Sequence, residues 1–213
     1  LEVEAPAGLR IEIKSDSDSS VRATYLTREG RQSFESYGWM NGHSMRYTIP
    51  EGVKVIRLGY RATGYNTEFE GSFECDDEFY NRLWNESLWT LYVTMRDNYM
   101  DCPDRERGQW IGDVSVQAPQ IAYVLDKNGL LLLRKAIFDF IRLRKGDVLM
   151  GNLPGDCFCE LPAQSLNAIS EWGMISSYYQ ATKDRSVLDL AFEPAVAYLK
   201  LWETDGDGVV TPR

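Results

Sequence analysis

The sequence predicts a multi-domain chain of the β + α class, in which a strand-rich segment (residues 1–71) precedes a helical segment (residues 72–213). Three observations lead to this prediction. Apolar and polar residues alternate in the first segment, which is the period of a half-buried strand. After Gly71, apolar residues recur every three to five positions, which indicates amphipathic helices. Turn-forming clusters separate the strands and mostly short links join the helices, so neighbouring elements should run antiparallel.

Three strands are expected in the first segment, at residues 9–13, 21–26 and 53–60. The first alternates strictly (Leu9-Arg-Ile-Glu-Ile13), and the other two are rich in β-branched and aromatic residues. Turn signals such as Asn41-Gly42 lie between them. We therefore expect a portion of an antiparallel β-sandwich.

Five helices are expected in the second segment. Asp76 can cap the first, and Pro119 should kink the second or mark a wide turn. The third has a strong apolar stripe that includes Ile137 and Phe140. The expected spans are residues 76–96, 113–124, 130–144, 165–182 and 186–203. Such a series suggests stacked helical hairpins whose pocket lies at one end, where the loops gather.

Composition excludes several classes of function. The 213 residues carry a net charge of −9 without basic runs, so nucleic-acid binding is not expected. No apolar run reaches membrane-spanning length. The chain has four cysteines: Cys75, Cys102, Cys157 and Cys159. They are too few and too irregularly spaced for a disulfide scaffold or a zinc site, so we expect thiols or one incidental bridge. No metal or other cofactor is expected. The compartment cannot be assigned from the sequence.

The most informative stretch is the loop of residues 97–112 and its continuation, which contains Asp101-Cys-Pro-Asp-Arg-Glu-Arg-Gly-Gln-Trp-Ile-Gly-Asp113. Four carboxylates, two arginines and a tryptophan fall within thirteen residues. Long loops on rigid scaffolds commonly carry binding and chemistry. This loop is the leading candidate for a functional site.

Paired carboxylates are the working groups of glycoside hydrolysis, in which one donates a proton and another activates water or attacks carbon. Trp110 would give a flat platform for a sugar ring, and the arginines would hold selected carboxylates ionised. A structural alternative is a charged loop whose acids and arginines pair with one another while Trp110 packs on a core. The residue pattern favours Glu106 over Asp104 as the acid only slightly.

The same stretch, led by Met95-Arg-Asp-Asn-Tyr-Met100, resembles the signature segment of bacterial α-L-rhamnosidases. The resemblance continues through Asp113-Val-Ser-Val-Gln117 and through the segment from Leu161 to Asp184. It covers most of the helical half and, much more loosely, the strand-rich part. It implies an inverting glycosidase with a catalytic (α/α)₆ barrel that releases terminal L-rhamnose from glycosides.

Carried over by position, the resemblance makes Glu106 the general acid. Asp101 and Asp113 would line the sugar pocket, bind ring hydroxyls and stabilise the cationic transition state. Arg105 would bind sugar or hold a carboxylate ionised, and Asp104 would be a further substrate-binding residue. Trp110 would form part of the pocket wall. The implied partner is a rhamnoside, with the remainder of the catalytic barrel.

The resemblance is incomplete in one respect, because the barrel needs six hairpins and this chain supplies about five helices. The family's general base lies far downstream, and neither Glu160 nor Glu171 takes its place. We therefore expect a section of a longer enzyme that is inactive on its own. The alternative is a noncatalytic carbohydrate-binding or partner-binding module with a rhamnosidase-like pocket loop.

Overall fold

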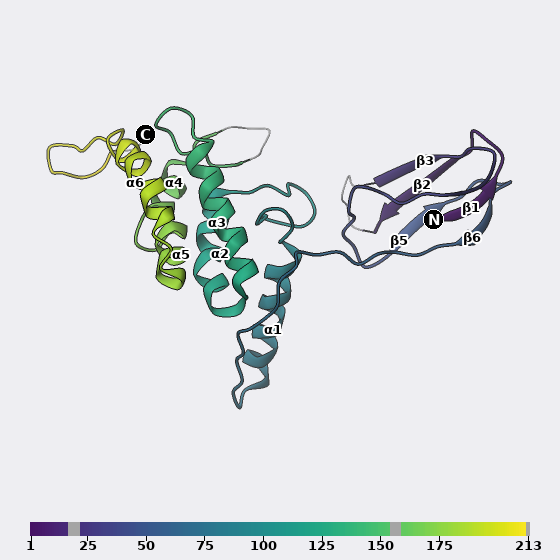
Figure 1. Cartoon of the computed structure of the whole chain (residues 1–213), viewed down its shortest axis with the longest axis horizontal. Coiled ribbons are helices and arrows are strands. Elements are labelled where there is room, and N and C mark those ends of the chain that lie inside the picture. The colour runs from purple at the N-terminus through teal and green to yellow at the C-terminus, as the bar shows by residue number, and fades with distance from the viewer. Residues whose placement is uncertain (17–21, 154–158, 212–213) are drawn as a thin grey trace. The chain divides into compact units, whose positions relative to one another are not determined.

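The computed structural model describes residues 1–16, 22–153 and 159–211 (Figure 1). Contacts within the chain divide it into two compact units. The strand unit comprises Leu1–Thr63 with Pro103–Glu106, and the helical unit comprises Gly64–Cys102 with Arg107–Arg213. The predicted domain boundary after residue 71 stays a prediction.

The strand unit contains two three-stranded antiparallel sheets. One sheet has the order β4-β1-β6 and the other β3-β2-β5. The strands are β1 (Glu2–Ala5), β2 (Arg10–Ser15), β3 (Arg22–Leu26), β4 (Gly30–Ser33), β5 (Met45–Thr48) and β6 (Lys54–Arg57).

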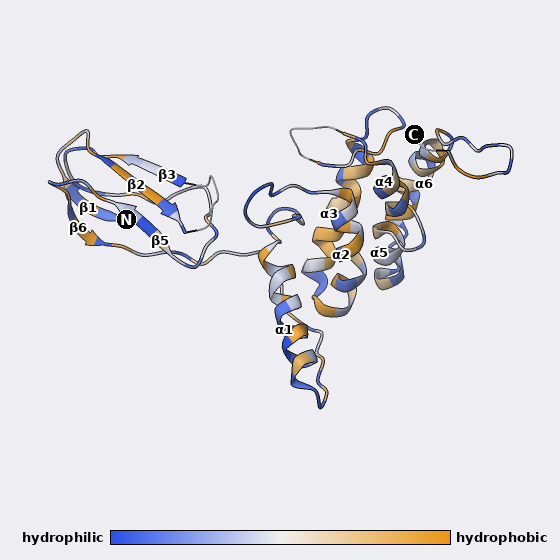
Figure 2. Cartoon of the chain, turned by 180° about the vertical axis from the view of Figure 1, so that it is seen from behind, coloured by the Kyte–Doolittle hydropathy of each residue, from blue (hydrophilic) through white to orange (hydrophobic). Residues whose placement is uncertain are grey.

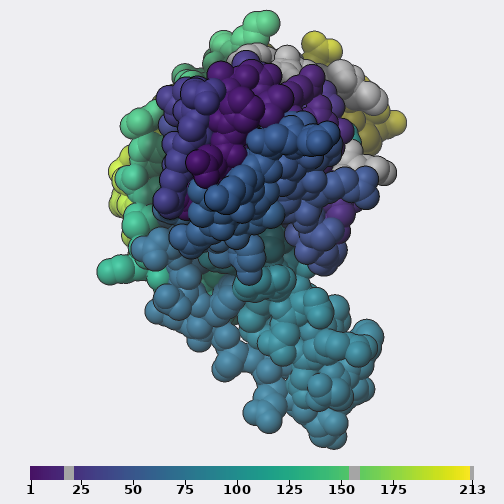
Figure 3. Space-filling model, turned by 90° about the vertical axis from the view of Figure 1, so that its right-hand side faces the viewer, coloured from purple at the N-terminus to yellow at the C-terminus, as the bar shows by residue number. Residues whose placement is uncertain are grey.

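A single small core joins residues of both sheets. Val3 of β1 and Ile11 and Ile13 of β2 are buried in one hydrophobic cluster. Ile11 and Ile13 are buried together because successive side chains of a strand point to opposite faces, so the alternation of Leu9-Arg-Ile-Glu-Ile13 places its apolar residues on one face. In Figure 3 the strand unit, coloured purple to blue, is a closely packed block.

The strand predictions were partly correct. The runs at residues 9–13 and 21–26 match β2 and β3, although Val21 lies outside the described residues. The strand expected at residues 53–60 was too long, because β6 ends at Arg57. Three strands were not predicted: β1, β4 and β5.

The helical unit contains six helices among the described residues. They are α1 (Glu78–Val93), α2 (Ile111–Val124), α3 (Lys127–Arg142), α4 (Pro162–Ala168), α5 (Met174–Thr182) and α6 (Ser186–Leu199). None of these helices is long and apolar enough to cross a membrane.

The core of the helical unit forms around α2 and α3, which carry much of the hydrophobic colour in Figure 2. Ile111, Val114 and Ile121 of α2 are completely buried. The predicted stripe of the third helix is confirmed except at Leu131, which is exposed. Its buried members are Leu132, Leu133, Ile137, Phe140 and Ile141. The helix α2 also runs through Pro119 without ending there.

The prediction of one helix over residues 165–182 was wrong. The structure has two helices, α4 and α5, which are separated by a turn that ends at Gly173. A Cβ atom at Gly173 would lie 2.3 Å from the carbonyl oxygens of Ala168 and Asn167, so the chain folds back there as only glycine allows. The helical content is therefore six helices rather than the expected five.

Candidate active site

The segment that leads into the candidate loop is anchored in the helical core. Met95, Tyr99 and Met100 are buried, and the Tyr99 hydroxyl donates to the carbonyl oxygen of Gly129 in α3 at 2.8 Å. Burial raises the pKa of Tyr99 well above its usual value, which further favours the protonated hydroxyl that donates this hydrogen bond. The position of Asp101 is thus tied to α3.

Asp101 and Gly108 close the candidate loop at its base. The Asp101 N–H donates to the Gly108 carbonyl at 3.0 Å, and the Gly108 N–H donates to Asp101 Oδ1 at 2.9 Å. Arg107, just before Gly108, has the left-handed backbone conformation that non-glycine residues rarely adopt, with φ of 54°. Asp101 therefore has a structural role in addition to the predicted role at the sugar pocket.

After Gly108 the chain pairs with the segment of residues 151–153. The Ile111 N–H donates to the Gly151 carbonyl at 2.8 Å, and the Leu153 N–H donates to the Gln109 carbonyl at 3.0 Å. Gln109 is completely buried and donates from Nε2 to Asp139 at 3.2 Å and to the Leu153 carbonyl at 3.1 Å. This ladder fixes the entry to α2.

Trp110 occupies the middle of this ladder, opposite Asn152. Its side chain is half-buried, and within the described part of the chain the indole Nε1 is enclosed without a hydrogen-bond partner. A Cβ atom at Gly108 would lie 2.9 Å from Trp110 Nε1 and 3.1 Å from Asn152 Oδ1. Glycine at position 108 therefore provides the space that Trp110 and Asn152 occupy.

The tip of the loop carries Glu106, which is exposed and forms an ion pair with the neighbouring Arg105. Residues 103–106, which include Asp104, belong to the strand unit, whereas Asp101, Trp110 and Asp113 belong to the helical unit. The structure thus gathers the predicted residues in two groups. Pairing of Arg105 with Glu106 is also what the structural alternative expects of a charged loop.

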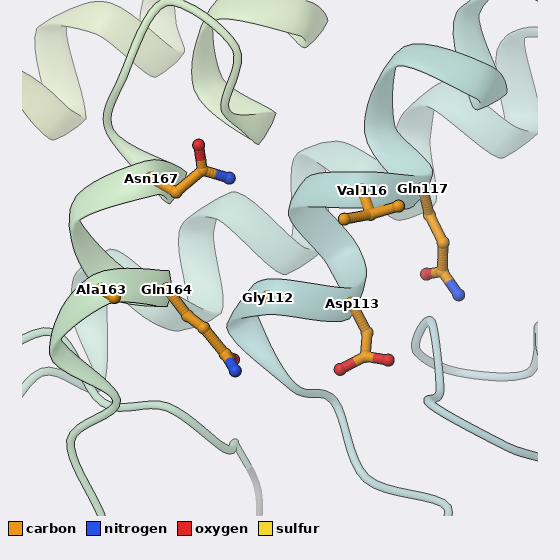
Figure 4. A pocket seen from close by; sticks show the side chains of 7 residues that line it. All are labelled: Gly112, Asp113, Val116, Gln117, Ala163, Gln164 and Asn167. Atoms are coloured by element: carbon orange, nitrogen blue, oxygen red, sulfur yellow. The ribbon is translucent and has the colours of Figure 1, made fainter.

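Asp113 lies in the first turn of α2 and lines a groove between α2 and α4 (Figure 4). The groove has a volume of about 540 Å³. It is lined by Gly112, Asp113, Val116, Gln117, Ala163, Gln164 and Asn167. The groove is open, and its lining combines the Asp113 carboxylate and three side-chain amides with apolar side chains.

Sequence reasoning did not single out Gln164 and Asn167, which lie opposite Asp113 across this groove. Both are polar residues on a short helix that begins at Pro162, and polar residues there are typical of a solvated surface. Only the packing of α4 beside α2 brings them to Asp113. Of the cysteines, Cys75 and Cys102 are free thiols, and Cys157 lies outside the described residues.

Comparison with known proteins places these features in a family. Residues 68–211 match the model of the bacterial alpha-L-rhamnosidase 6 hairpin glycosidase domain. Curated relatives include an alpha-L-rhamnosidase of Formosa agariphila, 28% identical over 158 residues, and one of Streptomyces avermitilis, 25% identical over 204 residues. The matches cover 70% and 88% of this chain but only 15% and 18% of those two proteins.

Solved structures share the fold. The alpha-L-rhamnosidase of Dictyoglumus thermophilum is 22% identical with a TM-score of 0.65, over 94% of this chain and 25% of that chain. A rhamnosidase of Klebsiella oxytoca with rhamnose bound is 15% identical with a TM-score of 0.66, over 100% of this chain and 47% of that chain. The Streptomyces avermitilis enzyme complexed with L-rhamnose is 19% identical with a TM-score of 0.63, over 94% of this chain and 21% of that chain.

Proposed function

The chain belongs to the bacterial α-L-rhamnosidase family of six-hairpin glycosidases, and from this premise we propose that it carries part of the active site of an inverting α-L-rhamnosidase. The observation that supports this most strongly is the extent of the family match, which includes the whole candidate loop from Asp101 to Asp113. The substrate class is taken from the relatives, two of which were solved with rhamnose.

The proposal extends to the architecture. Residues 1–71 would be a portion of a β-sandwich, and residues 72–213 would form the first helical hairpins of an (α/α)₆ toroid. The two small antiparallel sheets with one shared core support the first part. The packing of α4, α5 and α6 against α2 and α3 supports the second.

In the proposed mechanism, Glu106 donates its carboxyl proton to the glycosidic oxygen as the bond from that oxygen to the anomeric carbon breaks. Water attacks the anomeric carbon from the opposite face and loses its proton to a general base, which inverts the configuration. Arg105, which is next to Glu106, would stabilise the carboxylate that forms on proton transfer. No residue of this chain is assigned as the base.

Asp113 and Asp101 would bind ring hydroxyls and stabilise the positive charge that develops on the sugar. Asp113 lines the groove beside α4, where a sugar could reach it. Trp110 would form part of the pocket wall, and Asp104 would assist binding at the loop tip. These roles follow the family pattern position by position and form the testable content of the proposal.

A noncatalytic carbohydrate-binding or partner-binding module is the second candidate. The ion pair of Arg105 with Glu106 favours it, because a carboxylate already paired within its own loop needs no catalytic role to explain it. In that case the loop would shape a pocket without performing chemistry.

Substitution of Glu106 separates the two candidates. We would measure hydrolysis of an aryl α-L-rhamnoside and binding of L-rhamnose in the protein as its source expresses it, with Glu106→Gln, Asp104→Asn and the control Glu193→Gln, an exposed glutamate of α6. We expect Glu106→Gln alone to abolish turnover while sugar binding persists. Binding without turnover in the unaltered protein would favour the module, and loss of activity only in Asp104→Asn would move the acid to Asp104.

A further inference from the structure

The Gln164 side chain of α4 occupies the space beside Gly112 of α2. A Cβ atom added to Gly112, in the first turn of α2, would lie 2.3 Å from Gln164 Oε1 and 2.6 Å from its Cδ. The backbone φ of Gly112 is outside the left-handed region, so conformation does not require glycine there. The absence of a side chain at position 112 instead makes room for the Gln164 amide.

The Gln164 amide projects into the groove on the same open side as Asp113 (Figure 4). Gln164 is exposed, and its amide offers two N–H donors and a carbonyl acceptor to a ligand in the groove. Gln117, a further lining residue, has a buried Oε1 that has no partner among the described residues. Two amide groups that can hydrogen-bond a ligand thus lie beside the Asp113 carboxylate.

The remaining lining is small and apolar, with Val116 and Ala163 on facing helices. A sugar ring presents hydroxyl groups at its edge and C–H groups on its faces, so this combination of amides, carboxylate and apolar walls matches it. The groove volume of about 540 Å³ is within the usual range of small-molecule sites, roughly 300–1,000 Å³.

We propose that Gln164 is a substrate-binding residue, whose amide hydrogen-bonds ring hydroxyls of the sugar held by Asp113, and that Gly112 is glycine in order to admit it. A hydroxyl both donates and accepts, so one amide can bind two adjacent hydroxyls through its N–H and its oxygen. This inference rests on the proposed function for the identity of the sugar.

The test is a double-substitution cycle for L-rhamnose binding, measured by titration calorimetry on the protein as its source expresses it. We expect Gln164→Ala to raise the Kd about three- to tenfold, which corresponds to the loss of one or two neutral hydrogen bonds. Gly112→Ala should raise the Kd similarly, because the added methyl group displaces the Gln164 amide. In the double variant Gly112→Ala should add little, because the displaced group is already absent.

Gln120→Ala is the matched control, since Gln120 is an exposed glutamine of α2 that does not line the groove, and its Kd should equal that of the unaltered protein. A Gln164→Ala variant that binds normally, or additive effects of the two substitutions, would overturn the inference and leave the proposed function intact. Absence of rhamnose binding in the unaltered protein would overturn both. Binding that depends on Gln164 without any turnover would support the inference and refute only the catalytic proposal.

Discussion

Gly108 shows at the residue scale how one missing side chain shapes the candidate site. It is buried, it accepts from and donates to Asp101, and the place of its Cβ lies against Trp110 and Asn152. The sequence suggested only that a glycine would let the backbone turn near a ligand. The structural reason is space for the side chains of two residues whose backbones face each other across the ladder.

We therefore predict that Gly108→Ala lowers the free energy of unfolding by about 1–3 kcal/mol, the usual cost of an added group in a packed site. Thermal denaturation would measure it. The control is Gly206→Ala, because a Cβ at Gly206 would meet nothing within 4 Å and its φ is not left-handed. Equal melting temperatures of the two variants would show that the site has room for the methyl group.

Asp184 is a second residue whose role follows from its hydrogen bonds. It accepts from the Ser186 N–H at 2.9 Å, from Arg134 Nε at 3.0 Å and from the Tyr178 hydroxyl at 3.2 Å, and so connects α3, α5 and α6. The hydrogen bonds from Ser186, followed by the one from Arg134, lower the pKa of Asp184 from 3.8 to about 2. Its carboxylate form is therefore favoured by folding.

Because the folded pKa is depressed, the stability that Asp184 contributes should be complete above about pH 4 and should be lost as the pH falls toward 2. Melting temperatures of the unaltered protein and of Asp184→Asn would differ at pH 6, and the difference should shrink between pH 4 and 2. A difference that stays constant over that range would contradict the depressed pKa.

At the element scale, the two helix N-caps formed by aspartates differ in what they support. Asp126 accepts from the N–H groups of Asn128 and Gly129 and from the Thr67 hydroxyl, and it begins the core helix α3. Although burial acts to raise its pKa, these hydrogen bonds lower it. Asp77, and not the predicted Asp76, caps α1, with its side chain accepting only from the Phe79 N–H, and α1 buries only Leu91 among its residues.

We predict that Asp126→Ala destabilises the helical unit by about 1–2 kcal/mol, the upper part of the range for a lost N-cap. Asp77→Ala should cost less, because α1 contributes little to the core. Chemical denaturation followed by far-ultraviolet circular dichroism would compare the two variants. A larger effect of Asp77→Ala would mean that α1 is more important to the fold than its burial indicates.

The periodicity of apolar residues predicted the elements that bury one apolar face. It did not predict elements or breaks that depend on pairing or on close backbone contacts. The α3 stripe and the β2 alternation are visible in the sequence because their partners lie on one face. The strands β4 and β5 have only four residues each, too few for a clear periodic signal, and they depend on pairing with β1 and β2. The break before α5 depends on the close approach of carbonyl oxygens to Gly173, which no local pattern encodes.

The candidate site was predictable to a similar extent. The loop residues from Asp101 to Asp113 stand out because their types are unusual together. Gln164 does not, since its significance arises only from the packing of α4 against Gly112. Whether Glu106 and Asp101 act as the family pattern suggests is a question of chemistry that stays a prediction.

At the scale of the whole molecule, α1 is the most exposed apolar element. Phe79, Tyr80, Leu83 and Trp89 are each between 49% and 59% exposed. Neighbouring rings gather there, with Trp89 stacked on Tyr92 at 5.4 Å between ring centroids. The residues of α1 form the teal lobe at the bottom of Figure 3. Exposed apolar side chains gathered on one element promote association.

We predict that the 213-residue chain self-associates through α1. Light scattering should show a mass that rises with concentration, and the double variant Leu83→Lys, Trp89→Lys should lower it toward the monomer. Tyr37→Lys is the control, because Tyr37 is a fully exposed aromatic residue of the strand unit and isolated exposed side chains do not drive association. An effect of Tyr37→Lys equal to that of the double variant would contradict a role of α1.

The assignment of Glu106 as general acid is tested most directly by how the effect of Glu106→Gln on hydrolysis depends on the leaving group. Hydrolysis of phenyl and dinitrophenyl α-L-rhamnosides would be compared in the protein as its source expresses it and in its Glu106→Gln variant. A phenolate of high pKa needs a proton to leave, whereas dinitrophenolate does not, so we predict that kcat/KM falls about 10²- to 10⁴-fold for the phenyl substrate and far less for the dinitrophenyl substrate. Equal losses for both substrates would show that Glu106 does not donate the proton.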